Sequence, residues 1–213
     1  MFLVGSAMAP IARQFKQIII TAIFLHFAAI ALSQVRPQNS HTRISRQLKN
    51  FIQVTAEAGV QFTFPDEFKE IPAAHTDKFP FDYAISLPGK DFEIWFMIRA
   101  SKDYPRSETD PTANPDSSYN ILAETEVKAF TGDNGALTRI IPADILAGYN
   151  ANAGKTYLLT LQDLAETRHY KYALLVTLEK DHTGTVLVVC LGNEKGTTFF
   201  QNINKAANCL KFK

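Results

Sequence analysis

The sequence predicts an α+β protein, an α/β/α sandwich around a six-stranded, mainly antiparallel sheet. Six short segments alternate apolar and polar residues with the period of two that is typical of strands, and tight turns join several of them. Helix-like patterns stand before, between and after two groups of three such segments. Because tight turns make neighbouring strands antiparallel, these helices must cover the faces of one sheet.

The N-terminal segment, residues 1–33, is predicted to be a signal peptide. Basic residues precede an uninterrupted apolar run, 18–32, and small residues stand before the predicted cleavage position. A retained membrane anchor is the alternative, but a run of about 15 residues is short for a hydrocarbon core about 30 Å thick. We expect a disordered leader over residues 34–42 and a single α+β domain over residues 43–213.

The charge of the mature chain argues against polyanionic partners. The whole chain has 22 Lys and Arg against 21 Asp and Glu, and removal of the signal peptide takes away Arg13 and Lys16, which leaves 20 against 21. This balance predicts neither nucleic acid nor an anionic membrane surface as a partner. We expect an exported protein, periplasmic or extracellular, with no stable membrane span after cleavage, whose partner is an unknown protein or a small-molecule ligand.

The first predicted element of the domain is a helix over residues 42–58. Apolar residues share one face of it at helical spacing, and Gly59 supplies its end. Its N-cap is Thr42 or Ser45, since both hydroxyls suit that position. A strand that begins at Phe51 is the alternative interpretation of the same stretch.

Three strands complete the first group. Residues 60–64 alternate and stop at a proline, which suits an edge strand. Residues 79–87 and 92–99 alternate over longer stretches, and Pro88-Gly89 between them fits the central positions of a type II turn. These two longer strands are therefore expected to pair as a hairpin.

The second group follows a loop over residues 101–118 that contains three prolines and almost no apolar residues. Loops of this length are usually either functional or disordered, and the composition favours mobility. A helix is expected over residues 118–131, a short helix over 143–149 and a strand over 155–161.

Residues 170–191 form the most regular stretch of the chain, a hairpin of two strands. The first run, 170–178, alternates, whereas the second, 185–191, is apolar on both faces, as expected for an inner strand that is covered on both sides. A final helix is expected over residues 196–208, packed on the sheet face that holds Cys190.

No catalytic or cofactor motif is present in the sequence. It lacks a Gly-x-Ser-x-Gly elbow, a glycine-rich phosphate loop and closely spaced Cys or His pairs for zinc. We therefore predict no cofactor and no metal site. The catalytic alternative is a group formed by Asp163, Glu166 and His169, in which a carboxylate could orient the imidazole. A solvated connecting loop explains the same three residues.

Four residues are candidates for binding a partner or a ligand. Glu93, Trp95 and Arg99 share one face of a predicted strand, and Tyr157 holds a strand position in the second group. A tryptophan beside charged groups suits a shallow binding surface. The alternative is a face of the sheet that lies under a helix.

The chain has two cysteines, Cys190 and Cys209. An exported protein could join them in a disulfide if the last helix packs against the strand of Cys190. Two buried thiols that act as small apolar side chains are the alternative.

Two short patterns resemble PsbP-like domains. They are residues 60–64 followed by Pro65-x-x-Phe68, and a close of hairpin, glycine-bounded strand and helix that ends in Leu210-Lys211-Phe212. The resemblance covers most of the chain through element order. It implies an α/β/α sandwich on an antiparallel sheet, many of whose bacterial members are exported, with a mostly non-catalytic accessory or binding role. The metal-binding residues of the photosystem-associated members cannot be placed in this sequence, and none is carried over.

These observations favour a non-enzymatic binding or accessory protein of the cell envelope. One alternative is an exported hydrolase whose scattered site is the Asp163, Glu166 and His169 group. The other is a subunit of an envelope complex that docks through the face of Trp95.

Overall fold

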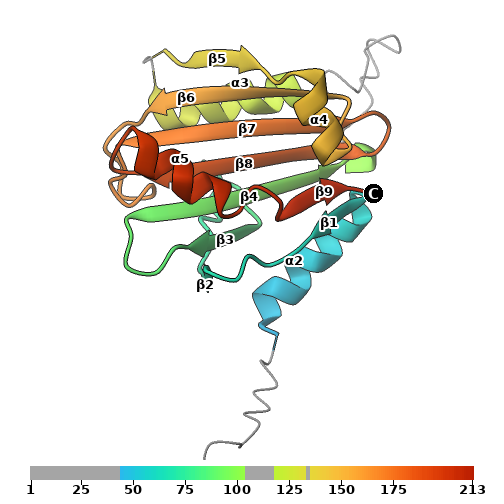
Figure 1. Ribbon diagram of the computed structural model, residues 1–213, viewed down its shortest axis with the longest axis horizontal. Coiled ribbons are helices and arrows are strands. Elements are labelled where there is room, and N and C mark those ends of the chain that lie inside the picture. The colour runs from blue at the N-terminus through green and yellow to red at the C-terminus, as the bar shows by residue number, and fades with distance from the viewer. Residues whose placement is uncertain (1–43, 104–117, 133–134) are drawn as a thin grey trace, which may run out of the picture. The chain divides into compact units, whose positions relative to one another are not determined.

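A seven-stranded antiparallel sheet runs through the protein and separates two hydrophobic cores (Figure 1). The computed structural model describes residues 44–103, 118–132 and 135–213. The predicted signal peptide, the leader and most of the loop 101–118 lie outside these residues. The strands, in spatial order, are β2 (Lys69–Ile71), β3 (Tyr83–Ser86), β4 (Phe92–Ala100), β8 (Gly184–Gly192), β7 (Tyr172–Lys180), β6 (Ala153–Thr160) and β5 (Leu137–Ile140).

Helices cover both faces of this sheet, so the α+β class and the layered arrangement are confirmed. On one face lie α2 (Arg46–Glu57), α4 (Ala143–Tyr149) and α5 (Thr197–Asn204), and on the other lies α3 (Ser118–Thr131) (Figure 1). A single 3-10 turn, Ser101–Asp103, follows β4. Within the described ranges, no helix is long and apolar enough to cross a membrane.

The predicted number of six strands is wrong: the sheet has seven, because β2 and β5 are additional strands at its two edges and the predicted strand 60–64 lies outside it. Both are only three or four residues long. All four residues of β5 are exposed, so an alternating apolar face could not reveal this strand. Hydrogen bonding along β6, rather than burial of its own side chains, holds β5 in place.

The predicted edge strand 60–64 belongs to a different sheet. Its first three residues form β1 (Val60–Phe62), which pairs antiparallel with β9 (Leu210–Phe212) in a separate two-stranded sheet. The final helix therefore ends at Asn204, and the C-terminal residues predicted to close it form a strand instead. Both Val60 and Phe212 are buried, which explains why this small sheet closes over the first core.

The first helix begins where a serine can cap it. The Ser45 hydroxyl accepts a hydrogen bond of 2.9 Å from the Leu48 N–H and donates to the Glu70 carboxylate on β2. Phe51 stacks on Tyr83 of β3 with ring centroids 4.6 Å apart. These contacts fix a helix on the sheet at the position where a strand was the alternative interpretation.

The hairpin of β7 and β8 lies in the interior of the sheet, as its apolar pattern predicts. β8 pairs with β4 on one side and with β7 on the other, and β6 lies beyond β7. Cys190 faces the first core together with Phe199 of α5, as expected for the last helix. The inner strands therefore fix the positions of the loops and helix ends at their tips.

Candidate functional site

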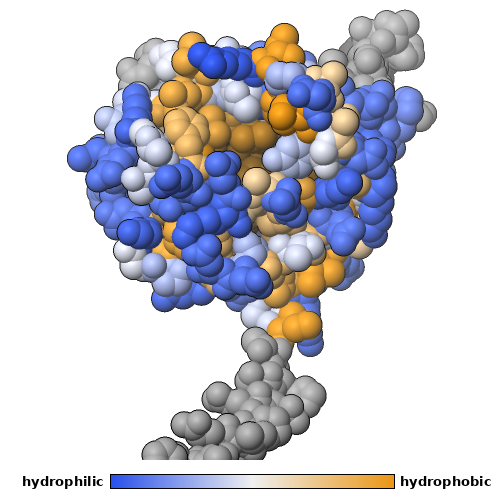
Figure 2. Space-filling model, in the orientation of Figure 1, coloured by the Kyte–Doolittle hydropathy of each residue, from blue (hydrophilic) through white to orange (hydrophobic). Residues whose placement is uncertain are grey.

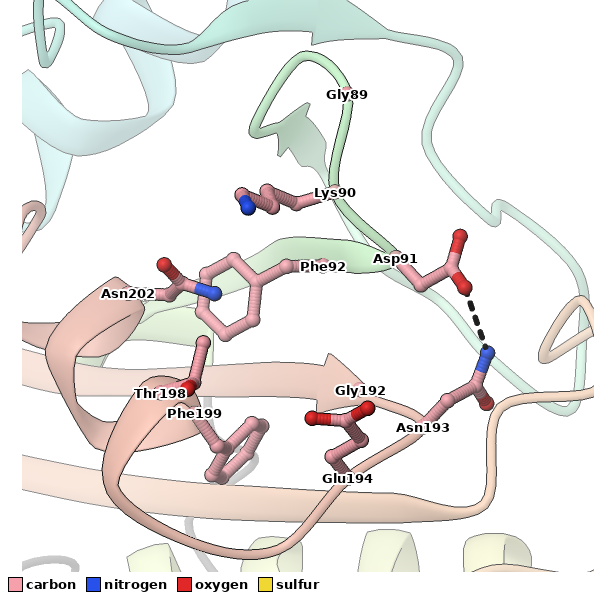
Figure 3. Close-up of a pocket in the computed structure, with 10 residues that line it drawn as sticks. All are labelled: Gly89, Lys90, Asp91, Phe92, Gly192, Asn193, Glu194, Thr198, Phe199 and Asn202. Carbon is pink, nitrogen blue, oxygen red and sulfur yellow. Dashed lines mark hydrogen bonds between the residues drawn. The ribbon is translucent and has the colours of Figure 1, made fainter.

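A pocket of about 270 Å³ opens at one end of β4 and β8 (Figure 3). Three segments that are distant in sequence form it: the turn between β3 and β4, the residues that follow β8, and α5. Phe92 and Phe199 are its main apolar residues, and polar side chains surround them. A pocket of this size suits a ligand smaller than a typical drug molecule.

The predicted Pro88-Gly89 turn places the first wall of the pocket. The Lys90 N–H donates to the Leu87 carbonyl at 3.1 Å, and Gly89 has a φ of +73°, as the third residue of a type II turn requires. The turn sends the chain into β4 and leaves Lys90 and Asp91 exposed at the rim.

Gly192 at the end of β8 allows α5 to pack close to the sheet. A Cβ atom at this position would lie 2.9 Å from the ring of Phe199, closer than packed carbon atoms tolerate. The Phe199 ring in turn meets Phe92 edge-on, with centroids 5.8 Å apart. The missing side chain at Gly192 is therefore a condition for the apolar floor of the pocket.

Asn202 is the most informative polar residue of the pocket. It lies on α5 and is only 8% exposed, yet among the described residues its side chain has no hydrogen-bond partner. Figure 3 shows the amide directed into the pocket beside the ring of Phe92. The polar atoms of this amide are not among the fully enclosed atoms that lack a partner in the described residues, so water in the pocket can solvate them, and a ligand that hydrogen-bonds to the amide would replace that water.

Charges of both signs stand around this amide. Lys90 and Glu194 are both exposed and lie on opposite sides of the pocket (Figure 3). Asp91 turns outward, where its carboxylate accepts a hydrogen bond of 3.4 Å from the Asn193 amide. The side-chain oxygen of Asn193, Oδ1, is buried and has no partner among the described residues. The pocket thus offers donors and acceptors, which suits binding.

The candidate binding residues of β4 are covered rather than exposed. Trp95 has no exposed surface, and its indole N–H donates to Glu93 at 2.9 Å. Arg99 binds the Asp82 carboxylate at 3.0 Å instead of joining that pair. The face therefore lies in the second core under α3, which is the alternative that the sequence left open, and a partner has no direct access to Trp95.

Tyr157 lies apart from this group, on β6. It is 5% exposed and borders a second hollow of about 310 Å³ beside α3. Burial raises the pKa of its hydroxyl, and the nearby Glu124 raises it further. The hydroxyl is enclosed without a hydrogen-bond partner among the described residues.

The structure brings Asp163 and His169 into contact, but on the surface. The His169 Nδ1 lies 2.5 Å from the Asp163 carboxylate, and both side chains are mostly exposed, at 67% and 84%. Glu166 is also exposed. None of the three lines either of the two pockets, so they occupy a solvated loop. No group of three metal-ligating side chains gathers anywhere in the part of the chain that the structure describes.

Cys190 and Cys209 are free thiols in the structure. Both belong to the first core. Burial raises the pKa of Cys209 to about 12 and also raises that of Cys190, so both stay protonated and act as small apolar side chains.

A second feature of the surface is an apolar hollow on the sheet between α4 and α5 (Figure 2). Leu137, Leu158 and Leu174 are register neighbours on β5, β6 and β7. Leu137 is 57% exposed, and the other two are half-buried. The helices on this face therefore leave a strip of the sheet uncovered.

The sequence did not predict this pocket, although the Pro88-Gly89 turn forms one of its walls. The fold and this site together define an α+β protein with a small polar pocket. The chain matches no known family model and no curated protein.

Proposed function

We propose that this chain is an exported, non-enzymatic binding or accessory protein of the cell envelope, whose small-molecule ligand occupies the pocket between α5 and the β3–β4 turn. The observation that carries the proposal is the buried Asn202 amide, which is directed into the pocket without a partner among the described residues. Pockets with an apolar floor and a few convergent polar groups are the usual form of ligand sites.

Export is the second part of the proposal. It is supported by the basic residues, the apolar run 18–32 and the small residues before position 34. The resemblance to PsbP-like domains supports an accessory role in the same compartment. Expression of the full chain with a C-terminal tag, followed by fractionation and N-terminal sequencing, tests this part. We expect an exported product that begins at Gln34, and a full-length product retained in the cytoplasm would contradict it.

A binding screen tests the ligand site itself. Residues 34–213 are titrated by calorimetry with a panel of small polar metabolites: the L-amino acids, neutral sugars and small carboxylates. We expect at least one probe to bind, and Asn202→Leu to weaken that binding at least tenfold. Gln201→Leu, at the exposed neighbouring position of α5, is the matched control and should bind as the unaltered protein does. Binding that is indifferent to Asn202→Leu would contradict the proposed site.

A second candidate function is supported by the apolar hollow between α4 and α5. We propose that it is the docking surface of an envelope-complex subunit, in place of the covered Trp95 face. β5 is the edge strand of the sheet in the described residues and borders this hollow, so a strand of a partner protein could pair with it and cover the row of leucines.

A charge on this row would test the second candidate. Leu158→Glu should leave the fold intact and abolish co-purification of a stoichiometric envelope protein with the tagged chain. Lys49→Glu, on the exposed side of α2, is the control. A chain that elutes alone at the monomer mass from gently solubilised envelopes would contradict this candidate.

A further inference from the structure

The polar groups of the pocket restrict the chemistry of its ligand. Lys90 provides a positive charge on one side, and Glu194 a negative charge on the other (Figure 3). The ion pairs among the described residues include neither of these side chains. Both charges are therefore ready to meet a ligand without first breaking an internal pair.

We infer that the pocket binds a small zwitterion of the size of a free α-amino acid, and this inference rests on the proposed function. The carboxylate of the ligand lies toward Lys90 and the N–H groups of the Asn202 amide. Its ammonium group lies toward Glu194. In this arrangement the Asn202 amide exchanges pocket water for a hydrogen bond to a charged group, and each charge of the ligand meets the opposite sign.

Other ligand classes fit these groups less well. A free anion such as phosphate would face Glu194 and the nearby Asp91, and like charges repel it. A simple amine would meet Lys90 and leave the donors of Asn202 unused. A neutral sugar could bond to Asn202 but would use neither charge.

The size of the pocket sets an upper limit on the ligand. Its volume of about 270 Å³ is below the range usual for drug-sized molecules, so a long peptide would not be enclosed. The floor formed by Phe92 and Phe199 gives the side chain of the ligand an apolar surface to cover. An amino acid with a compact, uncharged side chain meets both conditions.

Single-charge analogues test the inference directly. Residues 34–213 are titrated by calorimetry with each neutral L-amino acid. The tightest binder is then compared with its N-acetyl derivative, which lacks the ammonium, and with its carboxamide, which lacks the carboxylate. We expect each analogue to bind at least tenfold more weakly than the zwitterion. Equal binding of an analogue and its parent would overturn the inference.

Two variants assign the two charges. Glu194→Gln should weaken binding of the zwitterion but not that of the N-acetyl analogue, because that analogue is an anion with no ammonium to pair with Glu194 and is repelled by its charge. Lys90→Met should weaken the zwitterion but not the carboxamide. Asp181→Asn, in the exposed turn at the opposite end of β8, and Lys49→Met are the controls.

The outcomes separate this inference from the proposed function. If glucose binds and its binding depends on Asn202, while no amino acid binds, the inference of a zwitterionic ligand is wrong but the proposed ligand site is retained. Absence of binding by every probe, with the folded state verified by circular dichroism, would overturn both.

Discussion

The indole N–H of Trp95 donates a hydrogen bond of 2.9 Å to the carboxylate of Glu93, which lies two residues earlier on β4. Both side chains are buried. The second oxygen of Glu93 meets the Arg168 guanidinium at 2.5 Å. Glu93 is 7% exposed, so this carboxylate satisfies two donors at the edge of the second core. The charged face of β4 therefore has a structural role in holding the loop of Arg168.

Glu93→Ala should accordingly destabilise the protein without touching the pocket. Removing the carboxylate leaves the buried indole N–H without an acceptor and the guanidinium with only its bond to the Pro72 carbonyl, which should lower the free energy of unfolding by about 1–3 kcal/mol. Chemical denaturation of residues 34–213 measures it. The control is Glu166→Ala, which removes an exposed carboxylate from the loop that also holds Arg168. It should change the free energy of unfolding by less than about 0.5 kcal/mol. Equal effects of the two variants would refute the role of Glu93.

Glu126 on α3 should make stability depend on pH. It is 3% exposed, and its Oε2 has no partner among the described residues. Burial raises its pKa from the ordinary value of 4.5 to about 7, against a smaller lowering by the charge of Arg99. Between these two pH values the folded protein holds a proton that the unfolded chain releases, so the free energy of unfolding falls as pH rises.

Denaturation at several pH values measures this contribution. The stabilisation that protonated Glu126 gives the folded state should be fully present below pH 4.5 and lost as pH rises through about 7. The free energy of unfolding should fall by a total on the order of 2–3 kcal/mol over this range. Glu126→Gln keeps the shape of the side chain and should remove this part of the pH dependence. A Glu126→Gln profile parallel to that of the unaltered protein would show that another group is responsible.

The two cysteines should be unreactive in the folded protein. Cys190 and Cys209 are buried and burial raises the pKa of both thiols, so little reactive thiolate forms at neutral pH. Alkylation with iodoacetamide followed by mass spectrometry should find no modification in the folded state and two modified thiols in denaturant. A mass two units lower with no titratable thiol in denaturant would instead show a disulfide.

Gly192→Ala should disturb both stability and the pocket. The new methyl group would press on the Phe199 ring at 2.9 Å, and overpacking of this kind costs about 1–3 kcal/mol. We also expect loss of ligand binding, because α5 must move away from the pocket floor. Gly148→Ala is the control: it lies exposed in α4 with open space around it, so alanine should be neutral or slightly stabilising there. Unchanged binding by Gly192→Ala would contradict the role of this close contact.

The elements that the sequence predicts well are those that alternate over a long stretch. β4 and β7 each have nine residues with an apolar face, and their positions follow from that pattern alone. β5 and β9 are short strands that are defined by their pairing with β6 and β1. Such pairing between segments distant in the chain leaves no pattern in the local sequence. Burial of a strand on both faces also explains why Trp95 lies in the core, since a strand pattern does not say which side a helix will cover.

The pocket could not be predicted for a similar reason. Asn202 is an ordinary polar residue in the helical pattern of α5, and Gly192 is an ordinary strand end. The close packing of Phe199 over Gly192 places α5 beside the β3–β4 turn, so that Asn202, Lys90 and Glu194 line one pocket. The site therefore arises from tertiary packing. The one local signal, the Pro88-Gly89 turn, predicts the change of chain direction at one wall of the pocket but not that a pocket is there.

Asn202→Leu should separate stability from function. The asparagine amide faces the pocket and has no protein partner in the described part of the chain, so an apolar side chain of similar size breaks no internal hydrogen bond and should change the free energy of unfolding by less than about 0.5 kcal/mol. The same change should abolish ligand binding. Denaturation in the absence and presence of the ligand measures both effects, and the ligand should stabilise only the unaltered protein. A variant that is clearly less stable without ligand would show that the Asn202 amide makes a hydrogen bond within the fold and does not need a ligand.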